Sequence, residues 1–244
     1  MAPKLRHALA LATLCTAAFT AHADSFYALN TFADSNGVGP DLVPMPFPAP
    51  SVGTLGGGLY TFGQNQGLSL DWSGFDPAGY TIELKFSFDD ANSTSGWRKI
   101  IDFKHQTADE GLYAYQGSLQ FVEHAGWDFI NPIQIIPGQP LTFESGRVVD
   151  LLVTRNAATD QFSAWIDGVL QFSFVDSAKQ GVFDTYPGTA SPNASARFFI
   201  DDTVTGFGEA SAGHADFIRV APVPLPATAP LMLGALAFLR RRAR

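Results

Sequence analysis

Four acidic residues lie close together near the end of the chain: Asp201, Asp202, Glu209 and Asp216. Carboxylate oxygens are the ligands that calcium prefers, and calcium accepts six to eight of them in irregular geometry. Antiparallel strands and their loops can bring such residues together. The four residues are therefore the candidate metal site, and calcium is the possible cofactor. The alternative is that Asp201 and Asp202 end a strand as solvated acids.

Other chemistry-bearing motifs are missing from the sequence. A glycosidase needs two carboxylates about 5–9 Å apart, and no Glu-x-Asp-x-x-Glu spacing occurs. The segment 208–213 has the wrong spacing for a Gly-x-Ser-x-Gly nucleophile. His105, His124 and His214 are not spaced like zinc ligands. We therefore predict no catalytic residues. The acidic loop 89–96 is a second candidate cation loop or a plain connection.

Trp165 is the candidate ligand-binding aromatic residue. It shares one strand face with Ser163, while Phe162, Ala164 and Ile166 share the other. If the second set packs in the core, Trp165 lies on an outer surface, where its ring could stack on a sugar. Burial of Trp165 between the sheets is the alternative.

The elements that must position these residues are predicted to be strands. The segment 80–88 alternates apolar and polar residues strictly, which is typical of a half-buried antiparallel strand. Asp167-Gly168 between two alternating segments is the strongest hairpin signal, because both residues tolerate positive φ. Further runs occur at 68–72, 100–104, 111–115, 119–123, 148–154, 162–166, 170–175, 197–200 and 216–220. The proline-rich segment 40–50 is predicted to be extended or irregular. The pattern predicts an all-β, two-sheet antiparallel sandwich over 24–221.

Several segments in order resemble the laminin-G-like and concanavalin A-like jelly rolls. The strand ending in Thr154-Arg155 and the hairpin with Trp165-Ile-Asp167-Gly168 carry the resemblance. The segments 111–121, 199–202 and 208–220 are similar to middle and closing strands of that family. The resemblance implies two curved antiparallel sheets that often bind glycans or protein ligands and sometimes calcium. It implies no single activity.

Both ends of the chain are predicted to be processing signals. Lys4 and Arg6 precede a short apolar stretch, and Ala21 and Ala23 form the small-x-small pattern at which signal peptidase cleaves. The predicted signal peptide is a helical segment over 1–23, ahead of the sandwich domain 24–221 and a short helical C-terminal tail. Its removal also removes Cys15, the one cysteine of the chain, so the exported domain must fold without a disulfide.

The C-terminal segment 222–244 has three parts. Val223, Pro224, Leu225, Pro226 and Ala227 form a short motif, an apolar stretch follows, and Arg240, Arg241 and Arg242 make the end basic. This order resembles the PEP-CTERM sorting tail of Gram-negative bacteria, which implies recognition by an exosortase-type enzyme. Leu225 stands where that family usually has Glu. The alternative, a permanent membrane anchor, is disfavoured because the apolar stretch is short and proline-rich, so we expect only transient membrane contact.

The net charge of the predicted exported domain disfavours some classes of binding partner. Residues 24–221 hold nine Lys and Arg against all 23 Asp and Glu, a net charge of −14. Such a field disfavours nucleic acid and anionic lipid. We therefore predict a non-enzymatic, exported protein at the cell surface or in the extracellular matrix of a Gram-negative bacterium. Its expected partner is an exopolysaccharide or other glycan. A glycan-active enzyme and a structural coat component without a discrete ligand are the alternatives.

Overall fold

The computed structural model describes residues 24–46, 51–72, 74–90, 96–123, 134–138, 143–184 and 194–223. The predicted signal peptide and almost all of the predicted sorting tail lie outside these ranges, together with their predicted helices. Across the ranges that are described, no helix is long and apolar enough to cross a membrane. The described elements are strands, as the alternating pattern predicts.

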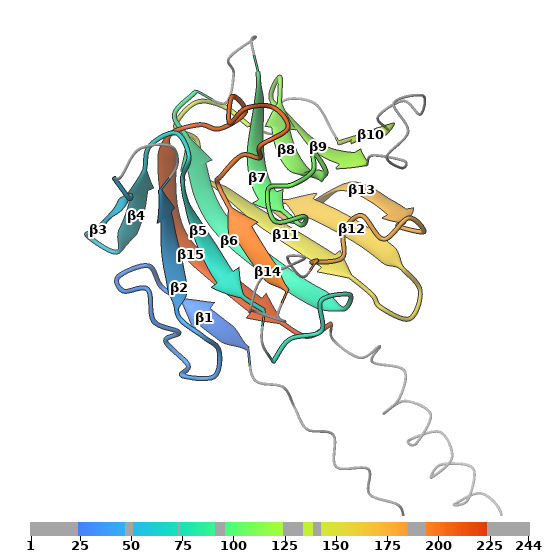
Figure 1. Cartoon of the computed structure of the whole chain (residues 1–244), viewed down its shortest axis with the longest axis horizontal. Helices are drawn as coiled ribbons and strands as arrows, with labels where there is room; N and C mark the ends of the chain where they lie inside the picture. Colours follow the sequence, from blue (N-terminus) through green and yellow to red (C-terminus); the bar gives the residue numbers. More distant parts are fainter. Residues whose placement is uncertain are drawn as a thin grey trace, which may run out of the picture.

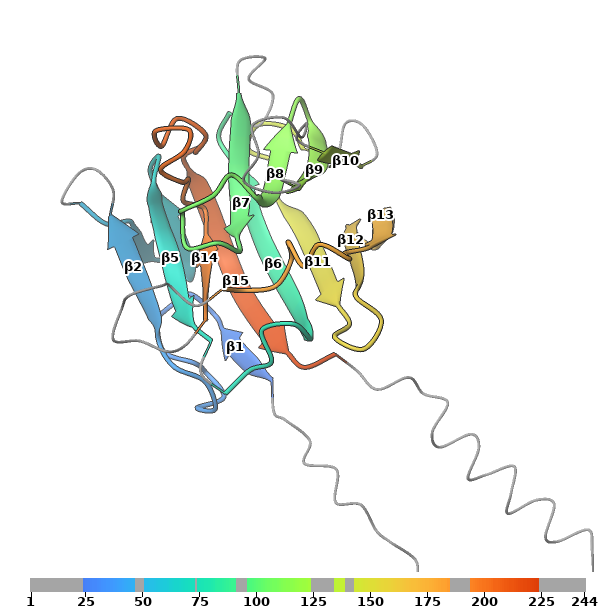
Figure 2. The same ribbon diagram turned by 45° about the vertical axis from the view of Figure 1, so that its right-hand side comes forward.

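The strands form two antiparallel sheets that pack face to face as a jelly-roll-like β-sandwich (Figures 1 and 2). The eight-stranded sheet has the order β13 (Val169–Val175), β12 (Gln161–Ile166), β11 (Val149–Arg155), β6 (Tyr80–Phe88), β15 (Gly213–Ala221), β4 (Leu59–Phe62) and β3 (Thr54–Gly56), with β1 (Ser25–Tyr27) also paired to β15. The seven-stranded sheet has the order β10 (Gln134–Pro137), β9 (Ser118–Glu123), β8 (Gly111–Tyr115), β7 (Trp97–Asp102), β14 (Ser195–Phe198), β5 (Gln66–Asp71) and β2 (Leu42–Pro46).

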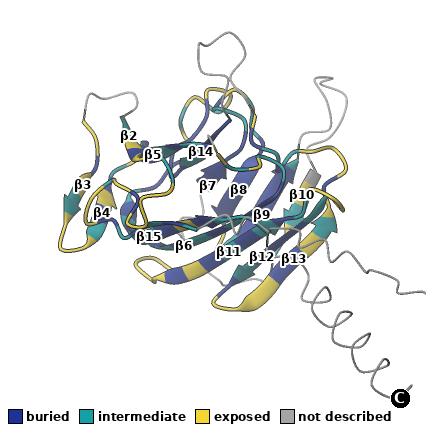
Figure 3. Ribbon diagram, turned by 90° about the horizontal axis from the view of Figure 1, so that it is seen from below, coloured by how far each residue is buried: buried dark blue, intermediate teal, exposed yellow. Residues whose placement is uncertain are grey.

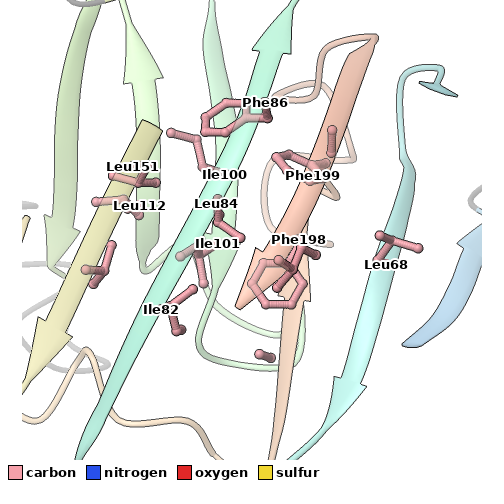
Figure 4. Packing of buried hydrophobic residues seen from close by; sticks show 14 of the residues in the cluster. Leu68, Ile82, Leu84, Phe86, Ile100, Ile101, Leu112, Leu151, Phe198 and Phe199 are labelled. Atoms are coloured by element: carbon pink, nitrogen blue, oxygen red, sulfur yellow. The ribbon is translucent and has the colours of Figure 1, made fainter. Parts of the chain in front are cut away.

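The apolar faces of the two sheets meet in one core, which is rich in phenylalanine (Figure 4). Ile82, Leu84 and Phe86 of β6 point into it, as their two-residue spacing predicts. The ring of Phe199 stacks on Phe62 of the other sheet at 4.6 Å between centroids. Burial of such aromatic area is the main stabilising contribution available to a domain that has no disulfide.

The Thr154-Arg155 motif closes one side of this core. Arg155 is fully buried, and its Nε donates to Asp176 Oδ2 at 2.7 Å. Its Nη1 donates to the Ala78 carbonyl at 2.6 Å, and its Nη2 to Asp160 Oδ1 at 2.9 Å. A buried guanidinium needs such partners because its desolvation is costly. The motif is therefore structural.

β15 connects the two ends of the sandwich. Near its end, Val220 pairs with Ser25 of β1, so the first and last described strands lie side by side. Its first residue, Gly213, pairs with Phe88, the last residue of β6. Asp89 donates its backbone N–H to the Ala212 carbonyl at 3.0 Å, so the residues that follow β6 and precede β15 meet at the end of the sandwich opposite to β1 (Figure 1).

Candidate functional site

A fully buried lysine organises the outer side of β7. Lys99 lies opposite Tyr113 of β8, and its ammonium lies 5.0 Å from the centre of that ring. Its Nζ donates to Asp102 Oδ2 at 3.3 Å and forms a shorter ion pair with Asp202. All three charged side chains are fully buried, and most of β7 and β8 is coloured as buried in Figure 3.

The β14–β15 loop is fixed on β7 by these carboxylates. Asp202 Oδ1 accepts backbone N–H donors from Val204 and Thr205 at 2.8 and 3.1 Å. Asp201 Oδ2 accepts the backbone N–H of Glu209 at 2.7 Å and the Thr205 hydroxyl at 2.7 Å. The Glu209 carbonyl in turn accepts the backbone N–H of Lys99 at 2.9 Å. The loop therefore holds Glu209 beside β7.

Negative charge exceeds positive charge in this cluster. Burial is the largest of the causes that raise the pKa of Glu209 to about 8, and repulsion by Asp109, Asp201 and Asp202 contributes to the same increase. Burial also raises the pKa values of Asp109 and Asp201. Burial alone would lower the pKa of Lys99, but the carboxylates around it outweigh burial and raise that pKa. The Lys99 ammonium thus lies in a cluster with five acids: Asp102, Asp109, Asp201, Asp202 and Glu209.

Aromatic rings adjoin the acids at the surface. Trp97 of β7 and Tyr115 of β8 stack with centroids 4.1 Å apart and planes 15° apart. Trp97 also meets Tyr113 edge-on at 5.6 Å, and the Tyr113 hydroxyl donates to Asp109 Oδ1 at 2.8 Å. Trp97, Tyr115, Asp109 and Glu209 are partly exposed, whereas Tyr113 beneath them is buried. We call these five residues the acid–aromatic rim.

An open cavity of about 430 Å³ adjoins the rim at the end of the sandwich. Arg98 forms a two-point pair with Asp90, with 3.1 Å to Oδ1 and 2.7 Å to Oδ2, and the Ser211 hydroxyl donates to Oδ1 of the same carboxylate. These hydrogen bonds, with Arg98 the largest contributor, lower the pKa of Asp90. The cavity is lined by Gln64, Asp89, Asp90, Arg98, Gly208, Ala210, Ser211 and Ala212.

The four predicted calcium ligands do not all meet. Asp201, Asp202 and Glu209 lie in one cluster, whereas Asp216 occupies a bulge in β15 and pairs with Lys85 at 3.7 Å. In the parts of the chain that are described, no group of three or more His, Cys, Asp or Glu is arranged to hold a metal ion. The Lys99 ammonium supplies a positive charge within the cluster, and calcium binding stays a prediction. In the second predicted cation loop, Asp90 is held by Arg98, and residues 91–95 lie outside the described ranges.

Trp165 lies on the outer face of the eight-stranded sheet. Phe162, Ala164 and Ile166 are buried in the core, so the partly exposed Trp165 points the other way, opposite Leu152 and Leu170. The strand register is therefore the one for which the sequence predicts the Trp165 ring on an outer surface. Ligand binding by Trp165 stays a prediction. Trp97, Tyr113 and Tyr115, the aromatic residues of the rim, were not singled out from the sequence. The one available signal was the two-residue spacing of the tyrosines, because the β7–β8 pairing is not visible in the sequence.

Comparisons with known proteins bear on the fold. No protein-family model and no curated protein matches the chain. Similar solved structures include a receptor-binding domain (TM-score 0.57, 11% identity, covering 86% of this chain and 49% of that one). The receptor-binding domain of a botulinum neurotoxin C/D mosaic serotype matches with a TM-score of 0.54 and 10% identity, covering 87% of this chain and 50% of that one. The binding domain of botulinum neurotoxin serotype D matches with a TM-score of 0.53 and 11% identity, covering 83% of this chain and 48% of that one. The chain spans about half the length of these neighbours. The class that the fold defines is therefore a two-sheet antiparallel β-sandwich, and a likeness at 10–11% sequence identity shows the fold alone.

Proposed function

We propose that this protein is an exported, non-catalytic carbohydrate-binding domain whose ligand lies on the acid–aromatic rim. The stacked and partly exposed Trp97–Tyr115 pair carries this proposal. Aromatic faces offer a sugar ring a large contact area at little entropic cost, and neighbouring carboxylates accept hydrogen bonds from its hydroxyls. The structural similarity to a binding domain and a receptor-binding domain of botulinum neurotoxins supports a binding role.

The proposal includes export and sorting. Signal peptidase would cleave after Ala23, and an exosortase-type enzyme would act near Pro226. The product would reach the outer surface or the exopolysaccharide matrix of a Gram-negative bacterium. The mass of the protein purified from its host tests this part. A chain that starts at Asp24 and ends near Pro226 would support it, and an intact Arg244 would contradict it.

Variants of two tryptophans can show which of two candidate surfaces binds the ligand. Trp97 belongs to the acid–aromatic rim, and Trp165 lies on the outer face of the eight-stranded sheet. We expect Trp97→Ala to weaken binding to the best ligand of a glycan array at least tenfold, because the stacking platform is lost. We expect Trp165→Ala to leave that affinity unchanged. Isothermal titration of both variants, each checked for native melting, gives the comparison. The reverse pattern would move the ligand to the eight-stranded sheet, and no array ligand at all would favour the structural coat alternative.

A glycan-active enzyme is the second candidate, because the raised pKa of Glu209 suits a general acid. A glycosidase also needs an accessible ionised carboxylate opposite that acid. Asp202 is fully buried and held by Lys99, so the partly exposed Asp109 would have to take this role. Release of reducing ends from a bound glycan that Glu209→Gln abolishes would establish the enzyme instead.

A further inference from the structure

The acid–aromatic rim has more negative charge than its own residues neutralise. Lys99 is already engaged by Asp102 and Asp202 on the inner side of the cluster. Asp109 and Glu209 lie on the outer side and are partly exposed, and each repels the other. No ion pair to a lysine or arginine is found for either of them in the described part of the structure. A neutral sugar would leave this excess of charge unchanged.

A second observation points to a missing positive group or donor. Asp201 is completely buried, yet its Oδ1 has no hydrogen-bond partner. Its other oxygen accepts the Glu209 backbone N–H, so this carboxylate lies directly behind Glu209. A buried acceptor without a partner is costly. The cost falls when a cation binds close by, because a positive charge stabilises every carboxylate in the low-dielectric cluster.

The aromatic rings suit the same kind of ligand. Trp97 and Tyr115 present a stacked aromatic surface within the rim, and Tyr113 already lies against the Lys99 ammonium. A second cation beside Trp97 would gain the attraction of the ring face, which is strongest for tryptophan. Carboxylates and aromatic rings together are the groups that recognise an ammonium.

We propose that the rim binds glycans through a protonated primary amine, as in a hexosamine unit that lacks its N-acetyl group. The sugar ring stacks on the Trp97–Tyr115 pair, and the ammonium lies between Glu209 and Asp109. Anionic glycans are repelled by the same carboxylates and by the net charge of −14 of residues 24–221. The inference rests on the proposed function and names its ligand class.

The test compares glucosamine and N-acetylglucosamine hexamers of the same linkage, titrated into the exported domain at pH 6, where the amine is protonated. We expect the free-amine hexamer to bind at least tenfold more tightly, a difference of about 1.4 kcal/mol. Glu209→Gln should abolish the preference. Glu144→Gln, a change at an exposed acid in the loop before β11, should retain it. Titration in two buffers of different ionisation enthalpy adds a second measurement, because ammonium binding should release a proton from Glu209.

The possible results distinguish failure of the amine preference from failure of carbohydrate binding itself. Equal binding of both hexamers, or preference for the acetylated one, would overturn the amine inference and leave carbohydrate binding standing. A preference that survives Glu209→Gln would show general attraction to an acidic protein and would also overturn it. If neither hexamer binds, the inference fails, and the glycan array decides the proposed function by itself.

Discussion

Lys99 supplies the positive charge where the sequence suggested a calcium ion. Its ammonium contacts Asp102 and Asp202, two of the acids around the β14–β15 loop. An internal ammonium differs from a metal because its charge is covalently attached and always present. The ion pair between Lys99 and Asp202 therefore holds the β14–β15 loop on β7.

Removing this ammonium should be strongly destabilising. Lys99→Met leaves Asp102 and Asp202 buried without their partner, and breaking a buried pair costs about 3–5 kcal/mol. Lys85→Met is the matched control, because the Lys85–Asp216 pair is partly exposed and should contribute less than about 1 kcal/mol. Urea denaturation measures both. A small loss in Lys99→Met would show that water enters the cluster, and recovery in Lys99→Met with Asp202→Asn would confirm the cause.

Glu209 should make stability fall in mild alkali. Its pKa is raised from 4.5 in the unfolded reference to about 8 in the fold, so its protonated form is favoured by folding. This contribution is complete below pH 4.5 and is lost as pH rises through 8. We expect a lower melting temperature at pH 9 than at pH 7, and a smaller difference in Glu209→Gln. Identical pH profiles of the two proteins would contradict a raised pKa of Glu209 in the folded domain.

Calcium should have little effect on the native domain. Lys99 already pairs with Asp202, and Asp216 lies apart on β15. We expect the melting temperature to change by less than the experimental error on chelation and on return of calcium. A reproducible calcium-dependent rise would restore the metal site that the sequence suggests.

At the scale of elements, the alternation of apolar and polar residues predicts strands well where one face is buried and the other is exposed to solvent. The segments 80–88 and 111–115 match β6 and β8 residue for residue. The proline-rich segment 40–50 was predicted to be extended or irregular, and Leu42–Pro46 within it form β2, an edge strand in which a missing N–H is tolerated. β1, β3, β4 and β10 are short, so they carry too few residues to show a period.

Local sequence patterns predicted only the part of the candidate site that lies within one segment of the chain. Asp201, Asp202 and Glu209 were visible as acids close in sequence. Lys99 and Trp97 come from a strand about a hundred residues earlier, and only the sheet pairing brings them together. A bulge in β7 between Lys99 and Ile101 also shifts the register, which no local pattern reveals.

The β12–β13 hairpin offers a test of turn chemistry. Asp167 and Gly168 both have positive φ, 50° and 76°, as a type I′ turn requires. Gly168→Ala should destabilise the domain by about 1 kcal/mol because of this backbone conformation. Gly56→Ala is the control, since Gly56 lacks a positive φ and an added Cβ there meets nothing within 4 Å. Equal thermal shifts in the two variants would contradict the assignment.

At the scale of the molecule, stability comes from the packed sheets. The single cysteine of the chain is Cys15, in the segment predicted to be removed. We therefore expect the exported domain to melt at the same temperature with and without a reductant. A reductant-dependent decrease would show that Cys15 remains in the product and is bonded to another thiol.

The pairing of Ser25 with Val220 has a consequence for how the domain would stand on a cell. Asp24, the first residue after the predicted cleavage, is joined to Arg219 by an ion pair, so the new amino terminus and the strand leading to the sorting tail leave from the same pole. A protein tethered by that pole would hold Trp97 and Glu209 about one strand length away from the membrane. Tethering and ligand capture could then proceed at the same time without competing for space.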